Sequence, residues 1–175
     1  MKELILGGVR SGKSRLAEQH ALASGLAVTY IATATPGDAE MQARIAEHRR
    51  HRPPTWSLVE EPLALARALF EQAAPDRCLL VDCLTLWLTN LLGANEGNRF
   101  ATERQAFVEL LPQLPGHIIL VSNETGLGVV PLGALSRRFC DEAGWLHQEI
   151  AQLSDRVILT IAGLPHFLKG KQLHE

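Results

Sequence analysis

The chain has 175 residues, of which 46% are hydrophobic and 21% charged, which is typical of one globular domain with a buried core. Its formal net charge is −2, so no general basic excess indicates binding to nucleic acid or to an anionic membrane. No apolar run is long enough to span a bilayer, which predicts a protein without an integral membrane segment. Three cysteines without metal-type spacing, Cys78, Cys83 and Cys140, are typical of reduced thiols in a cytoplasmic protein.

Apolar runs alternate with helical patterns along the chain, which predicts an α/β protein with a mostly parallel sheet flanked by helices. In chain order, strands are predicted at residues 3–6, 27–32, 57–60, 78–81, 117–122 and 156–161. Helices are predicted at residues 13–23, 39–49, 63–73, 84–92, 102–111 and about 135–153. We expect Asp38 to cap the second helix and Pro62 to lie in the first turn of the third.

The first predicted strand runs directly into Gly7-Gly8-Val9-Arg10-Ser11-Gly12-Lys13-Ser14, which matches the nucleotide-binding P-loop pattern and is followed by a helix. The glycines let backbone N–H groups approach phosphate oxygens, and the helix directs the positive end of its dipole toward the same anion. We expect Lys13 to reach the β- and γ-phosphates and Ser14 to ligate Mg²⁺. The sequence therefore predicts a single P-loop NTPase-like (RecA-like) domain over residues 1–175.

Two further strand ends carry carboxylates. Asp82 closes an apolar strand, where P-loop proteins place the acid that organises Mg²⁺, although an aspartate here can also cap the next helix. Asn123-Glu124-Thr125-Gly126-Leu127-Gly128 follows another strand. Ligands of open parallel sheets collect at the carboxyl ends of the strands, so we expect this segment near Gly12 and Asp82. The segment either binds the second substrate or is a mobile glycine loop.

Residues 44–53 form a local basic patch with four arginines and two histidines. Arginine clamps phosphate oxygens through two parallel donors, so the patch suits a polyphosphate. Arg44 and His48 stand one helical turn apart and can face one ligand. Two alternatives stay open: the run is a solvated charged face, or His48 continues an apolar stripe with Met41 and Ile45 as a core residue.

Taken together, these segments resemble the bifunctional adenosylcobinamide kinase/adenosylcobinamide-phosphate guanylyltransferase family of cobalamin biosynthesis. Besides residues 7–14, the resemblance rests on Tyr30-Ile31-Ala32-Thr33-Ala34, Glu40-Met41 with Arg44-Ile45, His48, Arg52-Pro53 with Trp56, Leu80-Val81-Asp82-Cys83-Leu84-Thr85, Thr89-Asn90-Leu91 and residues 122–131. The segments Arg-Ile-x-x-His-x-x-x-Arg-Pro and Asn-Glu-x-Gly-x-Gly-x-Val-Pro are much more specific than the P-loop. The likeness covers nearly the whole chain.

The resemblance implies that ATP or GTP phosphorylates adenosylcobinamide, and that GMP then passes from GTP through a histidine to the adenosylcobinamide phosphate, releasing pyrophosphate. The matching histidine is His48 rather than His51, because His48 stands four residues before Arg52. The catalytic residues are then His48 and Lys13, and Ser14 and Asp82 are the Mg²⁺ ligands. The implied nucleotide contacts are Gly7, Gly8, Val9, Arg10, Ser11, Gly12, Lys13, Ser14, Ala32, Thr33, Ala34, Arg49, Arg50, His51, Arg52, Glu60 and Asp82. Related enzymes look like homotrimers.

Two other functions remain as hypotheses. A simple P-loop kinase of small molecules would use the Arg/His segment only as a substrate lid and would form no covalent nucleotide adduct. A nucleotide-sensing module would bind GTP and switch a partner without turnover. The lack of an Asn-Lys-x-Asp segment, which reads guanine in switch GTPases, argues against the sensing module.

Overall fold

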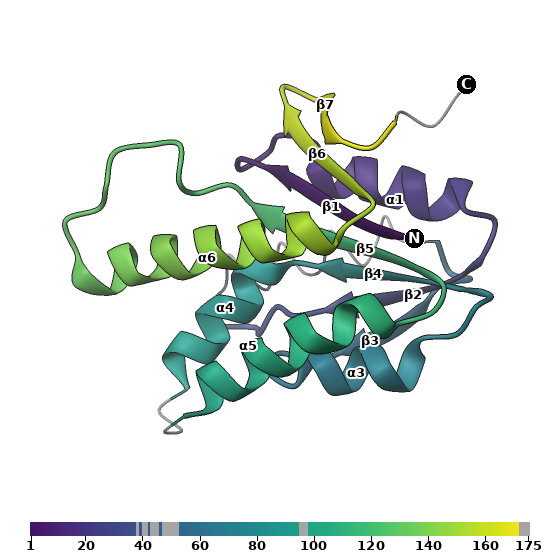
Figure 1. The fold of residues 1–175 in the computed structure, drawn as a ribbon, viewed down its shortest axis with the longest axis horizontal. Helices are drawn as coiled ribbons and strands as arrows, with labels where there is room; N and C mark the ends of the chain where they lie inside the picture. Colours follow the sequence, from purple (N-terminus) through teal and green to yellow (C-terminus); the bar gives the residue numbers. More distant parts are fainter. Residues whose placement is uncertain (38, 40–41, 43–45, 47–52, 95–97, 172–175) are drawn as a thin grey trace.

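A computed structural model describes residues 1–37, 39, 42, 46, 53–94 and 98–171 of the chain (Figure 1). Its strands are β1 (Lys2–Gly7), β2 (Ala27–Ala32), β3 (Ser57–Glu60), β4 (Arg77–Asp82), β5 (His117–Asn123), β6 (Arg156–Ile161) and β7 (Leu164–Lys169). Its helices are α1 (Lys13–Ala23), α3 (Leu65–Gln72), α4 (Leu84–Gly93), α5 (Arg99–Leu110) and α6 (Ala134–Leu153), with a short 3₁₀ helix at Leu111–Gln113. Among the described residues, no helix combines the length and the apolar character needed to cross a membrane.

The strands form one sheet in the order β3-β2-β4-β5-β1-β6-β7, in which only β7 runs antiparallel to its neighbour. Strand β5 lies between β1 and β4, so the strand before the P-loop is separated by one strand from the strand that ends at Asp82. The carboxyl ends of β1 to β6 therefore meet at one edge of the sheet, which is where open α/β sheets bind their ligands.

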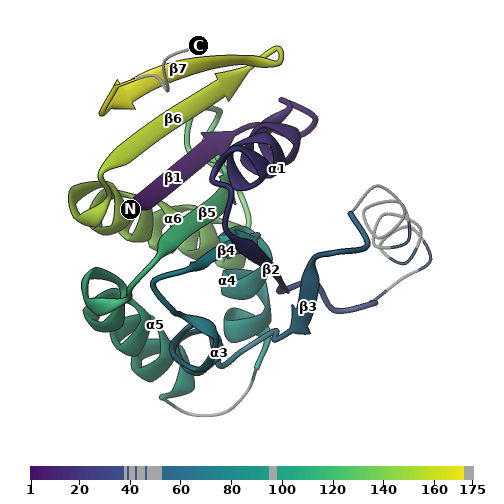
Figure 2. The same ribbon diagram turned by 90° about the vertical axis from the view of Figure 1, so that its right-hand side faces the viewer.

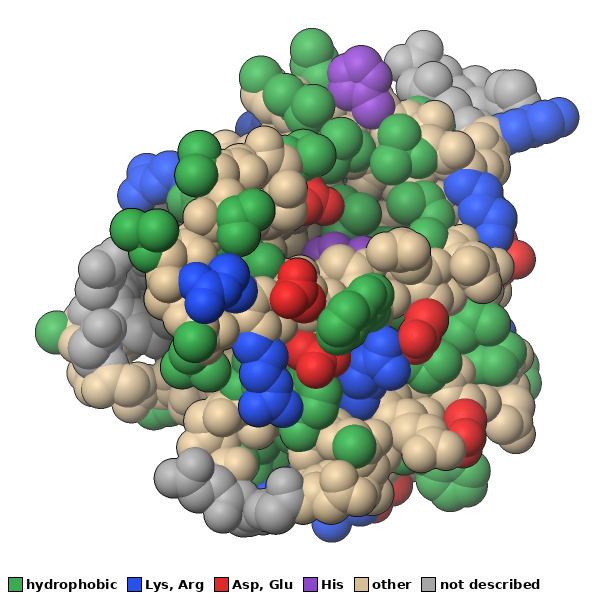
Figure 3. Space-filling view, turned by 60° about the vertical axis from the view of Figure 1, so that its left-hand side comes forward, with side chains coloured by type: hydrophobic (Ala, Val, Ile, Leu, Met, Phe, Trp, Pro, Cys, Tyr) green, Lys and Arg blue, Asp and Glu red, His purple; other side chains and the backbone are tan. Residues whose placement is uncertain are grey.

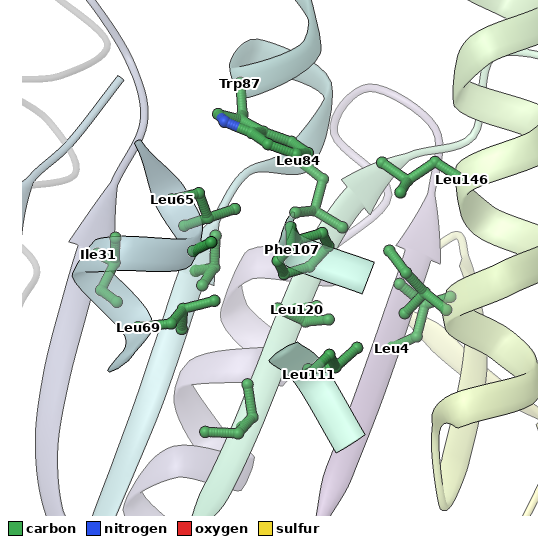
Figure 4. Close-up of a cluster of buried hydrophobic side chains, with 14 of the residues drawn as sticks. Leu4, Ile31, Leu65, Leu69, Leu84, Trp87, Phe107, Leu111, Leu120 and Leu146 are labelled. Carbon is green, nitrogen blue, oxygen red and sulfur yellow. The ribbon is translucent and has the colours of Figure 1, made fainter. Parts of the chain in front are cut away.

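Helices cover both faces of the sheet, as Figure 2 shows in end view. Helices α3, α4, α5 and α6 pack on one face, where alternate side chains of the strands, such as Leu4 and Leu120, meet the buried Trp87 and Phe107 (Figure 4). The rings of Trp87 and Phe107 meet edge to face with centroids 5.2 Å apart. Helix α1 covers the other face, over Ile5 and its neighbours in the sheet. Burial of both faces explains the nearly continuous apolar runs of the central strands.

Most predicted elements are confirmed within two or three residues of their bounds, and the strands at residues 27–32, 57–60 and 156–161 agree at both ends. Helix α3 begins at Leu65 instead of residue 63, so the prediction that Pro62 lies in its first turn is wrong. The carboxylate of Glu61 accepts hydrogen bonds from the N–H groups of Leu63 and Ala64, and these two donors stay outside the helix. The predicted helix at 39–49 and its cap Asp38 lie mostly outside the described residues.

Strand β7 has no counterpart among the predicted elements. It forms the exposed edge of the sheet, and Pro165 interrupts a short sequence that has no strong β-forming run. A tight turn at Ala162 and Gly163, both with positive φ, brings β7 back antiparallel to β6. The strand is therefore decided by pairing with β6 rather than by its own pattern.

A buried ion cluster holds the amino-terminal edge of the sheet together. Glu3 of β1 is fully buried, His20 of α1 contacts its Oε1, and His117 Nε2 and Arg156 Nη1 each lie 3.4 Å from Oε2. Burial by itself would raise the pKa of Glu3, but the contacts from His117 and His20 and the charge of Arg156 outweigh it and lower the pKa to about 2. Glu3 is therefore an ionised group on which three elements converge.

Replacing Glu3 with glutamine is expected to lower the free energy of unfolding by about 3 kcal/mol, because the buried Arg156 loses its counter-charge. The stabilisation linked to the low pKa of Glu3 is complete above about pH 4.5 and is lost as the pH falls toward 2. The parent protein and the variant should therefore converge in acid, which urea unfolding at neutral pH and at a series of lower pH values measures. Glu71→Gln, on the exposed face of α3, is the control. Equal stability at neutral pH would contradict the role of Glu3.

Candidate functional site

The turn from β1 into α1 depends on two glycines, Gly7 for lack of space and Gly12 for its positive φ. A Cβ atom on Gly7 would lie 2.4 Å from Ser11 Oγ and 2.7 Å from the carbonyl oxygen of Thr160. Gly12, with φ 94°, is the N-cap of α1, and a Cβ there would lie 3.2 Å from the Cα of Gly163. The loop therefore needs glycine at both positions to hold its curvature.

Hydrogen bonds close this loop into a cradle. The N–H of Ser11 and the ammonium of Lys13 both donate to the carbonyl of Gly8, at 3.2 Å each. The N–H of Gly163, in the β6–β7 turn, donates to the carbonyl of Ser11 at 2.8 Å. Ser11 Oγ is buried and has no hydrogen-bond partner among the described residues. This arrangement fits a bound polyphosphate. The tight loop lies at a helix N-terminus, a lysine lies beside it, and a buried hydroxyl has no partner among the described residues.

The carboxyl ends of β2 and β4 are tied together next to the cradle. Asp82 pairs in register with Ala32 of β2 and Val121 of β5. The hydroxyl of Thr33 donates to the carbonyl of Cys83 at 2.7 Å and accepts the N–H of the same residue at 3.0 Å. The backbone after β2 is thus fixed against the backbone that follows Asp82.

Asn90 of α4 extends this connection to β3. Its side-chain amide donates to the carbonyls of Thr33, at 2.7 Å, and Pro62, at 3.1 Å. Its amide oxygen accepts the hydroxyl of Thr35 at 3.3 Å. One side chain therefore holds the segments that follow two neighbouring strands, and these segments include the predicted nucleotide contacts Thr33 and Ala34.

Thr85 of α4 connects the same edge to β5 and β1. Its hydroxyl accepts the side-chain amide of Asn123 at 3.0 Å and the backbone N–H of Asn123 at 3.3 Å. The next residue, Glu124, donates its N–H to the carbonyl of Gly7 at 3.0 Å. The prediction that the segment 123–128 lies beside the P-loop is thereby confirmed at its first two residues.

The thiol beside Asp82 is a weak nucleophile at neutral pH. Burial, reinforced by the charge of Asp82, raises the pKa of Cys83 to about 11, so the thiol stays protonated. The sulfur lies 3.1 Å from the hydroxyl of Thr85, and together they are part of the polar contacts along this edge. A covalent intermediate on Cys83 is therefore disfavoured.

The predicted site residues fall into two groups. Those at positions 7–14, 32–34 and 82 all lie along the carboxyl edge of the sheet, and Glu60 ends β3 at the same edge, in register with Ala32. The predicted residues His48, Arg49, Arg50, His51 and Arg52 lie outside the described residues. Their roles, and their approach to Lys13, stay predictions.

Three residues that shape this edge, Thr85, Asn90 and Gly163, have no role among the sequence-based predictions. Thr85 and Asn90 belong to the motifs that carry the family resemblance, so a signal for them was present. Gly163 carries no motif, and its contact with Ser11 depends on how the turn between β6 and β7 meets the P-loop.

The segment after Glu124 exposes an uncommon number of apolar side chains. Leu127, Val130 and Leu135 are 65–80% exposed, and Val129 and Leu132 are each 97% exposed. Figure 3 turns this side of the molecule forward and shows hydrophobic side chains among basic and acidic ones. The segment also closes a cavity of about 350 Å³ against the start of α6, with Thr125, Pro131 and Arg137 in its wall.

The fold and the cradle define a P-loop nucleotide-binding protein, and solved structures share the fold. The chain matches the RadB recombinase with a TM-score of 0.52 and 16% identity, covering 90% of this chain and 73% of that one. It matches a prototypical ATPase from the type III secretion system of pathogenic bacteria with a TM-score of 0.52 and 14% identity, over 90% of this chain and 50% of that one. These matches establish the fold alone.

The chain belongs to the cobinamide kinase / cobinamide phosphate guanyltransferase family, whose model matches residues 3–168. It is 66% identical over 173 residues to the bifunctional adenosylcobalamin biosynthesis protein CobP of Pseudomonas aeruginosa, covering 99% of this chain and all of the relative. It is 37% identical over 177 residues to the bifunctional adenosylcobalamin biosynthesis protein CobU of Salmonella typhimurium, covering 94% and 97% of the two chains.

Proposed function

We propose that this protein phosphorylates adenosylcobinamide with ATP or GTP and then transfers GMP from GTP to that phosphate. The products of the second step are adenosylcobinamide-GDP and pyrophosphate, and we assign both activities to one domain over residues 1–175. Membership of the family and the close relationship to a bifunctional protein support this function. The observation that carries it is the phosphate cradle at residues 7–14, which lies on the same sheet edge as Asp82.

We assign Lys13 and the loop amides to stabilise the charge that develops on phosphate oxygens in either reaction. We assign Ser14 and Asp82 to hold Mg²⁺, which when bound neutralises charge on the transferring and leaving phosphates. Ser14 is partly exposed in the first turn of α1, and Asp82 is partly exposed at the end of β4, so both side chains are accessible from the edge. In phosphoryl transfer, positioning and charge stabilisation supply most of the catalysis.

For the guanylyl transfer we propose His48 as the nucleophile. A neutral imidazole attacks phosphorus near neutral pH, and the phosphorus–nitrogen bond that forms is labile enough to pass GMP onward. We assign Arg49, Arg50 and Arg52 to neutralise the transferring phosphate. The test is incubation with α-labelled GTP, followed by mapping of the acid-labile adduct. Label on His48 is the expected result, and a protein that turns over cobinamide without any adduct would favour the simple kinase.

We also propose a homotrimer in the cytoplasm. The free thiols of Cys78, Cys83 and Cys140 suit a reducing compartment. The exposed apolar segment around Val129 and Leu132 supports association, because an apolar patch of this kind on a soluble protein marks an interaction surface.

Replacing both Val129 and Leu132 with glutamate is expected to shift the protein from trimer to monomer, because two charges would have to be desolvated in the interface. Size-exclusion chromatography with light scattering measures the mass in solution. Phe70→Glu is the control, since Phe70 of α3 is 70% exposed but far from this segment in the chain. A double variant that keeps the mass of a trimer would show that the segment has another role.

A further inference from the structure

We propose that Glu124 is the general base of the kinase step, and that its carboxylate takes the proton of the acceptor hydroxyl as the oxygen attacks the γ-phosphorus. This inference rests on the proposed function and adds a catalytic residue to it. Neither the P-loop motif nor the assigned Mg²⁺ ligands supply a group for this proton. A positioned carboxylate commonly accepts it in kinases.

The strand order places Glu124 between the phosphate cradle that follows β1 and Asp82 at the end of β4. Strand β5 lies between β1, which leads into the cradle, and β4, which ends at Asp82. Glu124 directly follows β5, and its N–H donates to the carbonyl of Gly7, whereas the Lys13 ammonium donates to the carbonyl of Gly8. Two consecutive carbonyls of the P-loop thus hold the backbone of Glu124 and the side chain of Lys13.

The strand end that carries Glu124 is fixed from the side of the helices. Asn123 is bonded to Thr85 of α4, and the hydroxyl of Ser122 lies 2.7 Å from Nε2 of His147 in α6. Ser122 and His147 are both more than nine-tenths buried. A base must be held within hydrogen-bond reach of the proton that it removes, and these anchors supply that rigidity.

One oxygen of the Glu124 carboxylate remains available. The other, Oε1, accepts the N–H of Gly126 at 2.6 Å, whereas Oε2 receives no hydrogen bond from any residue that the structure describes. The nearby His147 does not neutralise the carboxylate: burial lowers the pKa of His147, and this outweighs the opposing charge of Glu124. The imidazole is therefore mostly uncharged at pH 7, and Glu124 forms no ion pair with any residue that the structure describes.

A cavity large enough for part of an alcohol substrate is lined by residues that directly follow Glu124 in the chain. The 350 Å³ cavity begins at Thr125 and Gly126, the two residues that follow the glutamate. In the reaction, the acceptor O–H bond breaks toward the carboxylate, an oxygen–phosphorus bond forms, and the bond from the γ-phosphorus to its bridging oxygen breaks. The nucleoside diphosphate leaves, and the protonated Glu124 returns its proton to water.

The decisive variant is Glu124→Gln, because glutamine keeps an oxygen for the N–H of Gly126 and loses only the basic carboxylate. We expect the kcat of the kinase step to fall by roughly 10²–10⁴-fold. Guanylyl transfer to substrate that is already phosphorylated should stay within about threefold of the parent, because its acceptor is a phosphate anion that needs no base. The pH dependence of the kinase rate should also differ between the variant and the parent, because a glutamine cannot accept the proton.

Asp155→Asn is the matched control. Asp155 also accepts a backbone N–H, from Lys2 at 2.7 Å, but it lies at the amino-terminal ends of the strands. It should leave both activities and the kinase pH profile unchanged. Kinase activity of Glu124→Gln within about tenfold of the parent would overturn the proposal, and so would an equal loss of both activities. A parent protein that does not phosphorylate cobinamide would instead refute the proposed function.

Discussion

Replacing Lys13 with alanine is expected to lower the rates of both the kinase and the guanylyl-transfer step by roughly 10²–10³-fold. The ammonium lies over the loop, bonded to the carbonyl of Gly8, and is the cation that the P-loop motif directs to the phosphates. In both reactions negative charge grows on phosphate oxygens as the leaving group departs, so loss of a preorganised cation raises both barriers. Rates of cobinamide phosphorylation and of GMP transfer, measured with saturating substrates, give the two effects.

Lys171→Ala is the control for Lys13, because this lysine is exposed beyond the last strand. The variant should keep both activities, and thermal unfolding should show that Lys13→Ala remains folded. Loss of only one activity in Lys13→Ala would show that the two reactions use separate triphosphate sites. If Lys13→Ala kept both activities, the P-loop lysine would have no part in either reaction.

Replacing His48 with alanine is expected to abolish attachment of GMP to the protein and to lower guanylyl transfer by roughly 10³-fold or more, since the group that carries the nucleotide is removed. Kinase activity should persist in part, because the γ-phosphoryl group passes directly to the acceptor hydroxyl. Labelling with α-labelled GTP, followed by acid lability and peptide mapping, measures the first effect. Product formation from cobinamide and from cobinamide phosphate separates the two reactions.

His51→Ala is the matched control, because it removes the other imidazole of the same basic segment. It should still form the acid-labile adduct. Full guanylyl transfer in His48→Ala would refute the assignment, and an adduct lost only in His51→Ala would move the nucleophile to His51.

The P-loop and the buried strands could be predicted from the sequence, because the residues that determine each of them are neighbours in the chain. The P-loop needs a strand, a glycine turn and a helix within the first 23 residues, and all three are specified there. The buried strands were predicted because both faces of the sheet are covered, which makes their apolar runs continuous. The exposed edge strand β7 lacked that signal and was missed.

The sequence by itself determined the class of protein, the phosphate loop and the family, since the phosphate loop and each separate motif of the family are made of residues that are close together in the chain. Only the tertiary structure decided that β5 lies between β1 and β4, which places Glu124 against Gly7. It also decided that Asn90 joins the ends of two strands and that the Gly163 turn closes the cradle. These contacts join positions far apart in the chain, and strand order is set by packing of the whole sheet rather than by any local pattern.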